Sequence, residues 1–204
     1  LMDEIIIVDT GSTDNTKEIA AQYTSRIYDF KWTSDFSAAR NFSFSKATME
    51  YIYTADADEI LDDANRERFL RLKDALLPEI EIVQMKYVTQ GTFDTVLNAK
   101  KEYRPKLFRR LRTFTWIDPI HETVRLTPVT FDSDVEILHC PQSLHSKRDF
   151  SIFIKAFEHD GQFSPKIRTM YAKELLKTGD KKDFTDAKPI FQLIFDNDPA
   201  DDAR

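Results

Sequence analysis

Residues 51–61, Tyr-Ile-Tyr-Thr-Ala-Asp-Ala-Asp-Glu-Ile-Leu, constrain the fold of this chain more than any other stretch. Their aromatic and apolar start is typical of a buried strand, and the acids that follow place two carboxylates at its C-terminal end. In an open α/β sheet, ligands bind at that end of the strands. The stretch therefore predicts an α/β protein with a binding site beside Asp56 and Asp58.

Asp56 and Asp58 stand two residues apart, so in an extended chain their side chains point to the same side. Two like charges held side by side are costly unless a cation lies next to them. Mg²⁺ and Mn²⁺ take oxygen ligands and can also hold the phosphates of a substrate. The spacing therefore favours a divalent cation bound together with a diphosphate.

Asp-x-Asp also occurs in three further contexts. An EF-hand loop needs an oxygen ligand at its fifth position and glycine at its sixth, where this chain has Ile60 and Leu61, so that loop is excluded. The pattern also resembles an aspartate-nucleophile phosphatase of the haloacid dehalogenase type, but Ile60 stands where those enzymes carry threonine. The third context is a polar turn that caps the next helix, and this remains an alternative interpretation of the two acids.

A second acidic strand end occurs near the start of the chain. Residues 5–8 are a continuous β-branched run of the kind found in buried parallel strands, and Asp9 follows directly. The next turn is rich in capping side chains and leads to a helix, with Asn15 and Glu18 at the spacing of a capping box. Asp9 is thus expected at the same topological place as Asp56.

Two further helices follow from the pattern. A helix over residues 36–47 carries Arg40, which can pair with the acids of the strand ends or grip a phosphate through its planar donor fork. A helix over residues 65–77 is expected to be capped by Asp62 or Asp63, with one buried face at helical spacing made of Phe69, Leu72 and Leu76.

Composition narrows the classes of function. The chain has 204 residues, 41% of them apolar, enough for one sizeable core, alone or with a small appendage. A net charge of −6 argues against nucleic acid or an anionic lipid surface as a partner. The four glycines are dispersed and form no Walker A or Gly-x-Gly-x-x-Gly motif, so phosphate binding would depend on metal and basic side chains. A single cysteine and the lack of a transmembrane segment predict a cytoplasmic protein, free or at the inner face of the membrane.

The second half of the chain continues with strands and then changes period. Strands are expected over residues 80–89, 103–110 and 135–140. A basic cluster coincides with the strand at 103–110 and the residues just after it. It is either a solvated strand face or a contact for an anionic acceptor or a diphosphate. Its members are Arg104, Lys106, Arg109, Arg110 and Arg112.

From residue 147 the apolar residues repeat at helical spacing and predict three packed helices. Their stripes are Phe150, Phe153, Ile154 and Phe157; Met170, Ala172, Leu175 and Leu176; and Ala187, Ile190, Phe191, Ile194 and Phe195. Such helices resemble the start of a tetratricopeptide-like array. We therefore expect a helical extension over residues 147–204, able to bind a partner or a further copy of the chain.

Three motifs together resemble the nucleotide-sugar half of family 2 glycosyltransferases. They are Ile-Ile-Val-Asp-Thr-Gly-Ser-Thr-Asp-Asn-Thr at 6–16, Ser-Ala-Ala-Arg-Asn at 37–41 and Ala-Asp-Ala-Asp-Glu at 55–59. Each is weak alone, but they occur in the family's order and spacing. The resemblance implies the GT-A fold, an α/β fold in which helices flank a mixed sheet, over residues 1–146.

The same resemblance implies roles for five residues in this sequence. Asp9 would meet the uracil or ribose of a UDP-sugar, Arg40 the base or phosphates, Asp56 the ribose and Asp58 the metal. Asp14 holds the turn and is a minor member of the nucleotide-sugar-binding set.

The chain departs from the resembled family at its start. Members normally have a further strand and helix before the segment that begins here at Asp3, and that first strand lies in the middle of the sheet. The resemblance therefore predicts a truncated transferase domain, with a gap between the strands at 5–8 and 51–55.

The resemblance also suggests residues for catalysis and for completing the metal site. Sugar transfer to a hydroxyl needs a base within hydrogen-bond reach, and Glu122 is the main candidate, with Asp118 and His121 as alternatives. His139, at the end of the last strand, is either a metal ligand or a buried, hydrogen-bonded histidine.

The sequence as a whole predicts a metal-dependent, inverting transferase that uses Mn²⁺ or Mg²⁺ and moves a sugar from a UDP-sugar to an acceptor. The sugar and the acceptor, whether glycan, lipid-linked or peptide, are not indicated. A degenerate transferase domain that binds a protein through its C-terminal helices is the alternative, and the phosphatase is the third hypothesis.

Overall fold

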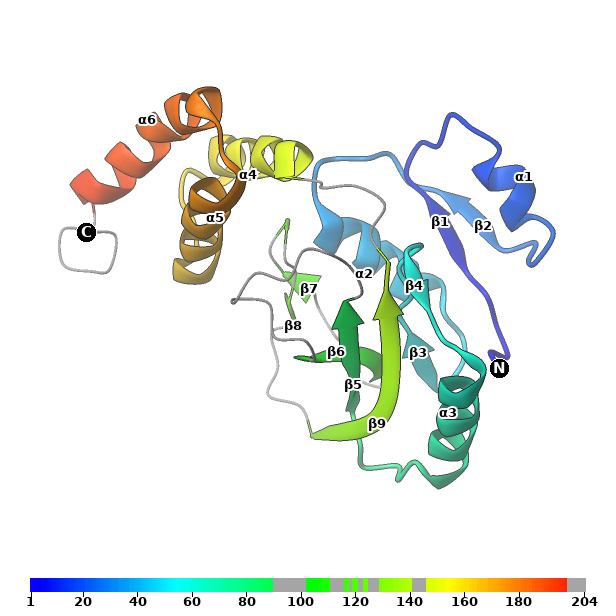
Figure 1. The fold of residues 1–204 in the computed structure, drawn as a ribbon. Helices are drawn as coiled ribbons and strands as arrows, with labels where there is room; N and C mark the ends of the chain where they lie inside the picture. The colour runs from blue at the N-terminus through cyan, green and yellow to red at the C-terminus, as the bar shows by residue number, and fades with distance from the viewer. Residues whose placement is uncertain are drawn as a thin grey trace.

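The protein is described by a computed structural model covering residues 1–89, 102–110, 116–117, 119–120, 123–124, 129–140 and 146–197. A five-stranded mixed sheet lies at its centre with two two-stranded sheets, and three helices gather at the C-terminal end (Figure 1). The predicted α/β architecture with helices after it is confirmed.

The central sheet has five strands in the order β3-β6-β5-β9-β4. In chain order these are β3 (Tyr51–Tyr53), β4 (Glu59–Ile60), β5 (Ile82–Thr89), β6 (Glu102–Arg109) and β9 (Thr130–His139). The β5–β9 pair is parallel, and the other neighbouring pairs are antiparallel. Strand β9 begins earlier than predicted, and β4 has no counterpart among the predicted strands.

Helix α3 (Asp63–Ala75) covers one face of this sheet. The Asp62 side chain accepts a hydrogen bond from the Asn65 N–H at 2.8 Å and so caps the helix, as predicted. Phe69 is buried among apolar residues of the sheet, including Val83 and Val135. The short-range pattern therefore identified both the cap and the buried face of this helix.

The N-terminal segment forms a sheet of its own. Strands β1 (Ile7–Asp9) and β2 (Ile27–Asp29) pair in parallel, and α1 (Thr16–Ala20) connects them. In the part of the chain that the structure describes, β1 pairs only with β2, and β3 pairs only with β6. Asp9, the last residue of β1, and Asp56, which follows β3, thus belong to strand ends of two different sheets.

The capping box predicted at the start of α1 is wrong. Asn15 occupies the N-cap position with φ −78° and ψ 18°, not the extended geometry that directs a side chain back to the helix, and it makes no capping hydrogen bond. The Asp14 carboxylate instead accepts from the Thr16 N–H at 3.0 Å. The acid before Asn15 therefore binds the first N–H of the helix, whereas the Asn15–Glu18 capping contacts that the pattern predicted do not form.

Helix α2 (Phe36–Lys46) is fixed against the sheet and the short pair β7 (Trp116–Ile117) and β8 (Thr123–Val124). The Asn41 side chain donates to the Trp116 carbonyl oxygen at 3.1 Å and accepts from the Trp116 N–H at 2.9 Å. The Phe44 ring packs edge-on against Phe108 and Trp116. These contacts fix the helix that carries Arg40.

The C-terminal helices are α4 (Ser146–Asp160), α5 (Pro165–Thr178) and α6 (Lys181–Asn197). Their core is aromatic, with the Phe153 and Tyr171 rings stacked at 4.5 Å. Trp32, Phe36 and Ile120 join the same apolar cluster, so the helices pack against the preceding part of the chain. None of the described helices is both long and apolar enough to cross a membrane.

One predicted stripe is misplaced on α5. Ile167, Tyr171 and Leu175 are buried at a spacing of four residues, whereas Leu176 is 80% exposed. A position one residue further along a helix is rotated by about 100° and faces away from the core. The buried face of α5 therefore includes Tyr171, which the pattern omitted, and excludes Leu176.

Candidate functional site

The turn that carries the two acids is held by strand pairing. Residues 56–58 follow β3, and the short strand β4 then pairs antiparallel with β9, which sets Glu59 opposite His139. The Cys140 N–H donates to the Asp58 carbonyl oxygen at 2.8 Å. Long-range pairing therefore brings the end of β9 to the acidic turn.

Asp58 and His139 face each other across this junction. His139 Nε2 lies 3.1 Å from Asp58 Oδ2, and both side chains are partly exposed. Adjacent ligands of an octahedral ion with bonds of 2.0–2.1 Å are about 3 Å apart, so the two atoms fit neighbouring coordination positions. The described residues contain no cluster of three or more metal-binding side chains, so further ligands would have to come from substrate and water.

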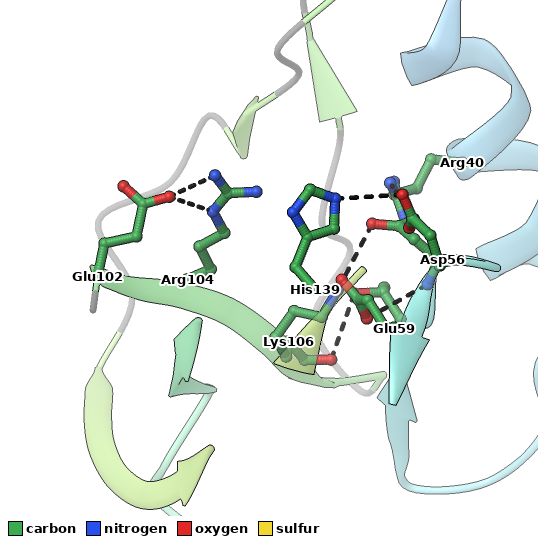
Figure 2. Close-up of polar contacts among 9 residues, drawn as sticks. Arg40, Asp56, Glu59, Glu102, Arg104, Lys106 and His139 are labelled. Carbon is green, nitrogen blue, oxygen red and sulfur yellow. Dashed lines mark hydrogen bonds and ion pairs between the residues drawn. The ribbon is translucent and has the colours of Figure 1, made fainter. Parts of the chain in front are cut away.

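Asp56 lies between two cations (Figure 2). An Arg40 nitrogen is 3.7 Å from one carboxylate oxygen, and Lys106 Nζ is 3.7 Å from the other. Burial acts to raise the pKa of Asp56, but the charges of Lys106 and Arg40 outweigh it and lower that pKa. Asp56 is therefore an anion at neutral pH, with nearly half of its side chain open to a ligand.

Glu59 and Lys106 form a buried ion pair beneath these groups. Lys106 Nζ lies 2.6 Å from Glu59 Oε1. The Lys106 side chain is 6% exposed, and the Glu59 side chain is 3% exposed. Burial raises the pKa of Glu59 above its ordinary value of 4.5, although Lys106 opposes this. The sequence indicated Lys106 only as part of a basic cluster and gave Glu59 no role of its own. No sequence signal predicted their pairing, because the two-residue strand that carries Glu59 is too short to give a periodic pattern.

An aromatic ring supports the same site. The Tyr87 and His139 rings are 4.9 Å apart, and the Arg104 guanidinium lies over the Tyr87 ring at 3.9 Å. Glu102 accepts from Arg104 Nε at 2.5 Å. Arg104 therefore adds positive charge near Asp56, and its own position is fixed from two sides.

The structure divides the predicted basic cluster between several surroundings. Arg104 and Lys106 belong to the site, whereas Arg109 Nε lies 4.0 Å from a Glu50 carboxylate oxygen. Arg110 donates to the Met49 carbonyl oxygen at 2.6 Å. Arg112 lies outside the described residues. The cluster is thus neither wholly a solvated face nor wholly a binding surface.

Asp9 and Asp14 stand in the β1–α1 turn. Asp9 is buried, and one of its oxygens accepts from the N–H groups of Gly11 and Ser12, each at 3.0 Å. Lys17 Nζ is 3.7 Å from the same oxygen. Asp14 accepts from Thr16 in the next part of the turn. Both acids shape this turn, and their predicted part in nucleotide-sugar binding stays a prediction.

Replacing Asp9 with asparagine is expected to give a pH-dependent loss of stability. A hydrogen bond from the Ser12 side chain, helped by backbone N–H groups and Lys17 and opposed by burial, holds the pKa of Asp9 below its ordinary 3.8. A carboxyl with a lowered pKa stabilises the fold above its unfolded pKa, and this stabilisation is lost as pH falls through the folded pKa.

The difference in free energy of unfolding between wild type and Asp9→Asn should therefore be largest at neutral pH and shrink below about pH 4. Urea unfolding followed by circular dichroism at several pH values measures it. A difference that stays constant down to about pH 2 would show that the charge of Asp9 contributes nothing.

The predicted catalytic residues Asp118, His121 and Glu122 lie outside the described residues. Their neighbour Trp116 is described, and its buried ring lies 5.0 Å from the Arg40 guanidinium. The candidates for the general base stay predictions.

Comparison with known proteins identifies the family. The family model described as Glycosyl transferase family 2 matches residues 2–127, which is more than half of the chain. The chain belongs to glycosyltransferase family 2. The matched range includes Arg40, Asp56 and Asp58, whereas His139 and the C-terminal helices lie beyond it.

Individual relatives of this family 2 chain match shorter stretches. A TPR repeat-containing protein of Synechococcus elongatus, Synpcc7942_0270, is 45% identical over 60 residues, which are 29% of this chain and 15% of that protein. The SPbeta prophage-derived glycosyltransferase SunS of Bacillus subtilis is 31% identical over 105 residues, 50% of this chain and 25% of SunS. The chain thus matches only a small part of the length of these relatives.

Among solved structures, the chain is similar to S. aureus TarS (residues 1–349). The alignment covers 96% of this chain and 63% of the TarS chain, with 13% sequence identity and a TM-score of 0.44. That likeness is too weak to guide the assignment of any residue.

Proposed function

We propose that this family 2 chain binds a UDP-sugar through a divalent cation and transfers the sugar, with inversion, to an acceptor hydroxyl. The observation that supports this most is the convergence of Asp58 Oδ2 and His139 Nε2 at 3.1 Å, beside a group of cationic side chains. A nucleoside diphosphate carries the negative charge that such a site would hold.

The residues present fit a divalent cation. Asp58 and His139 would hold it through one oxygen and one nitrogen, and imidazole is a ligand of transition metals more than of Mg²⁺, so this pair favours Mn²⁺. When bound, the ion would supply positive charge against the negative charge that develops on the departing diphosphate. Arg40 would orient the phosphates with its planar donor fork, and Asp56 would accept from the ribose hydroxyls.

The acceptor side depends on the segment around residue 122, which lies outside the described residues. Glu122 would take the proton of the attacking hydroxyl, with Asp118 and His121 as alternatives. We expect Glu122→Gln to leave UDP affinity unchanged and to lower transfer by about 100-fold or more. A transfer assay with the acceptor, once identified, measures this, and unchanged transfer would assign the base to another residue.

Titration calorimetry of UDP with the whole chain, with and without Mn²⁺, tests the proposed function. Binding should be detectable with Mn²⁺ and weaken by about tenfold or more when EDTA removes it. UMP, which has one phosphate on the same nucleoside, should bind more weakly than UDP under the same conditions. Equal binding of UDP with and without metal, or no binding at all, would contradict the proposal.

Arg40→Ala is expected to weaken UDP binding without removing metal affinity. Arg40 contacts Asp56 and the Trp116 ring, whereas the proposed metal ligands are Asp58 and His139, which should stay in place. A charge-assisted contact to phosphate contributes about tenfold to 100-fold in affinity. Calorimetry with UDP and with Mn²⁺ alone separates the effects, and Arg71→Ala, on the exposed face of α3, is the matched control.

A second candidate function is a protein-interaction module. Four large apolar side chains on α5 and α6 are exposed, namely Leu176, Phe184, Leu193 and Phe195. Analytical ultracentrifugation tests self-association through these side chains. Association that Leu176→Lys removes and Asp58→Ala does not would favour this candidate, and a monomer at all concentrations would exclude a contact between copies.

A further inference from the structure

The buried ion pair of Glu59 and Lys106 is an unusual feature of this site. Removing two charges from water is costly, and a buried pair is often no more stabilising than apolar residues of the same size. Both partners come from strands that border the acidic turn: Glu59 is the first residue of β4, and Lys106 lies in β6. Their placement points to a role besides stability.

The side chain and the backbone of Glu59 both contact Asp56, the first residue of the turn. Glu59 Oε2 accepts from the Asp56 N–H at 3.3 Å, and the Glu59 N–H donates to the Asp56 carbonyl oxygen at 3.2 Å. In the β4–β9 pairing, Glu59 stands opposite His139. Glu59 therefore connects Asp56 to the strand that delivers His139.

Lys106 connects the turn to strand β6, the neighbour of β3 in the sheet. Its carbonyl oxygen accepts from the Thr54 N–H at 2.8 Å, and its ammonium lies 2.6 Å from Glu59 and 3.7 Å from Asp56. The turn is thus held at its start by the backbone of Lys106 and at its end by the Glu59–Lys106 pair (Figure 2).

We propose that Glu59 and Lys106 are positioning residues that fix the turn of residues 56–58, so that Asp58 faces His139 and Asp56 faces Arg40. This inference rests on the proposed function for the ligand that the turn meets. The Lys106 ammonium also places a positive charge between the carboxylates of Asp56 and Glu59, which offsets their mutual repulsion. Removing either partner should loosen the turn and separate the groups that bind UDP.

Lys106→Met tests this because methionine keeps much of the side-chain length and removes the ammonium. The first readout is UDP affinity in the presence of Mn²⁺, expected to fall by about tenfold to 100-fold, as when residues that orient metal ligands are replaced. The second is hydrogen exchange of the amides of residues 56–58 without metal or nucleotide, expected to be about tenfold faster.

The controls separate positioning from stability alone. Lys73→Met removes a lysine from the exposed pair with Asp3 and should change neither readout. Lys106→Arg keeps the charge and should recover most of the affinity. Glu59→Gln, which keeps the size of the side chain, serves as the second variant if Lys106→Met does not fold.

The positioning role is overturned if folded Lys106→Met or Glu59→Gln binds UDP with wild-type affinity while its turn amides exchange at the wild-type rate. A lower melting temperature alone, with both readouts unchanged, would assign the pair to stability and also overturn it. Failure of wild type to bind UDP with Mn²⁺ would contradict the proposed function, and hydrogen exchange would still decide whether the pair orders the turn.

Discussion

Asp58→Ala is expected to abolish the metal-dependent part of UDP binding. Asp58 supplies the negatively charged ligand of the proposed pair, and His139 alone would leave a divalent cation with one neutral protein ligand. We expect the affinity for UDP in the presence of Mn²⁺ to fall by about 100-fold or more, which corresponds to roughly 3 kcal/mol. Titration calorimetry at fixed Mn²⁺ measures the change.

Asp74→Asn is the matched control for this prediction. Asp74 is exposed near the end of α3, away from the acidic turn, so its replacement should leave UDP affinity within about twofold of wild type. Circular dichroism should show the same folded content for both variants. If Asp58→Ala binds UDP as tightly as Asp74→Asn does, the metal does not depend on the acidic turn.

Phe153→Ala is expected to cause the largest loss of stability. The ring is fully buried, stacks on Tyr171 and contributes to the cluster that Trp32, Phe36 and Ile120 also join. Replacing a buried phenylalanine with alanine costs about 3–5 kcal/mol, because the transfer free energy is lost and a cavity remains. Denaturant unfolding measured by circular dichroism gives the free energy.

Phe184→Ala is the matched control, since that ring lies on α6 and is 44% exposed. It should lower the free energy of unfolding by less than about 1 kcal/mol. Tryptophan fluorescence and far-ultraviolet circular dichroism should give coincident unfolding curves if the helices unfold together with the part of the chain they contact. A loss below about 1 kcal/mol for Phe153→Ala would show that this cluster is not a packed core.

The features that sequence predicted well are local. The cap at Asp62, the buried face of α3 and the helix that carries Arg40 depend on residues a few positions apart, within reach of one helical turn. The failures are also local in kind. Asn15 and Leu176 fitted their patterns, but Asn15 makes no capping hydrogen bond, and the buried face of α5 passes through Tyr171 and Leu175 instead of Leu176.

The arrangement of the site could be predicted only in part. The acidic turn and Arg40 follow from the three motifs, but the contact of Asp58 with His139 spans 81 residues, and that of Lys106 with Glu59 spans 47. Both depend on which strands pair, and β4, which sets Glu59 opposite His139, is too short to give a periodic signal. Single-sequence patterns do not specify such pairings, so the contacts of Glu59 could be found only in the structure.

If Asp58 and His139 hold one divalent cation together with the diphosphate of a nucleotide, both kinds of ligand should be detectable around the bound ion. Pulsed electron paramagnetic resonance of Mn²⁺ bound to the whole chain with UDP detects them. We expect hyperfine coupling to phosphorus of UDP and to one imidazole nitrogen, with the nitrogen coupling lost in His139→Gln. A Mn²⁺ spectrum without phosphorus coupling, or with a nitrogen coupling that survives in His139→Gln, would refute this metal site.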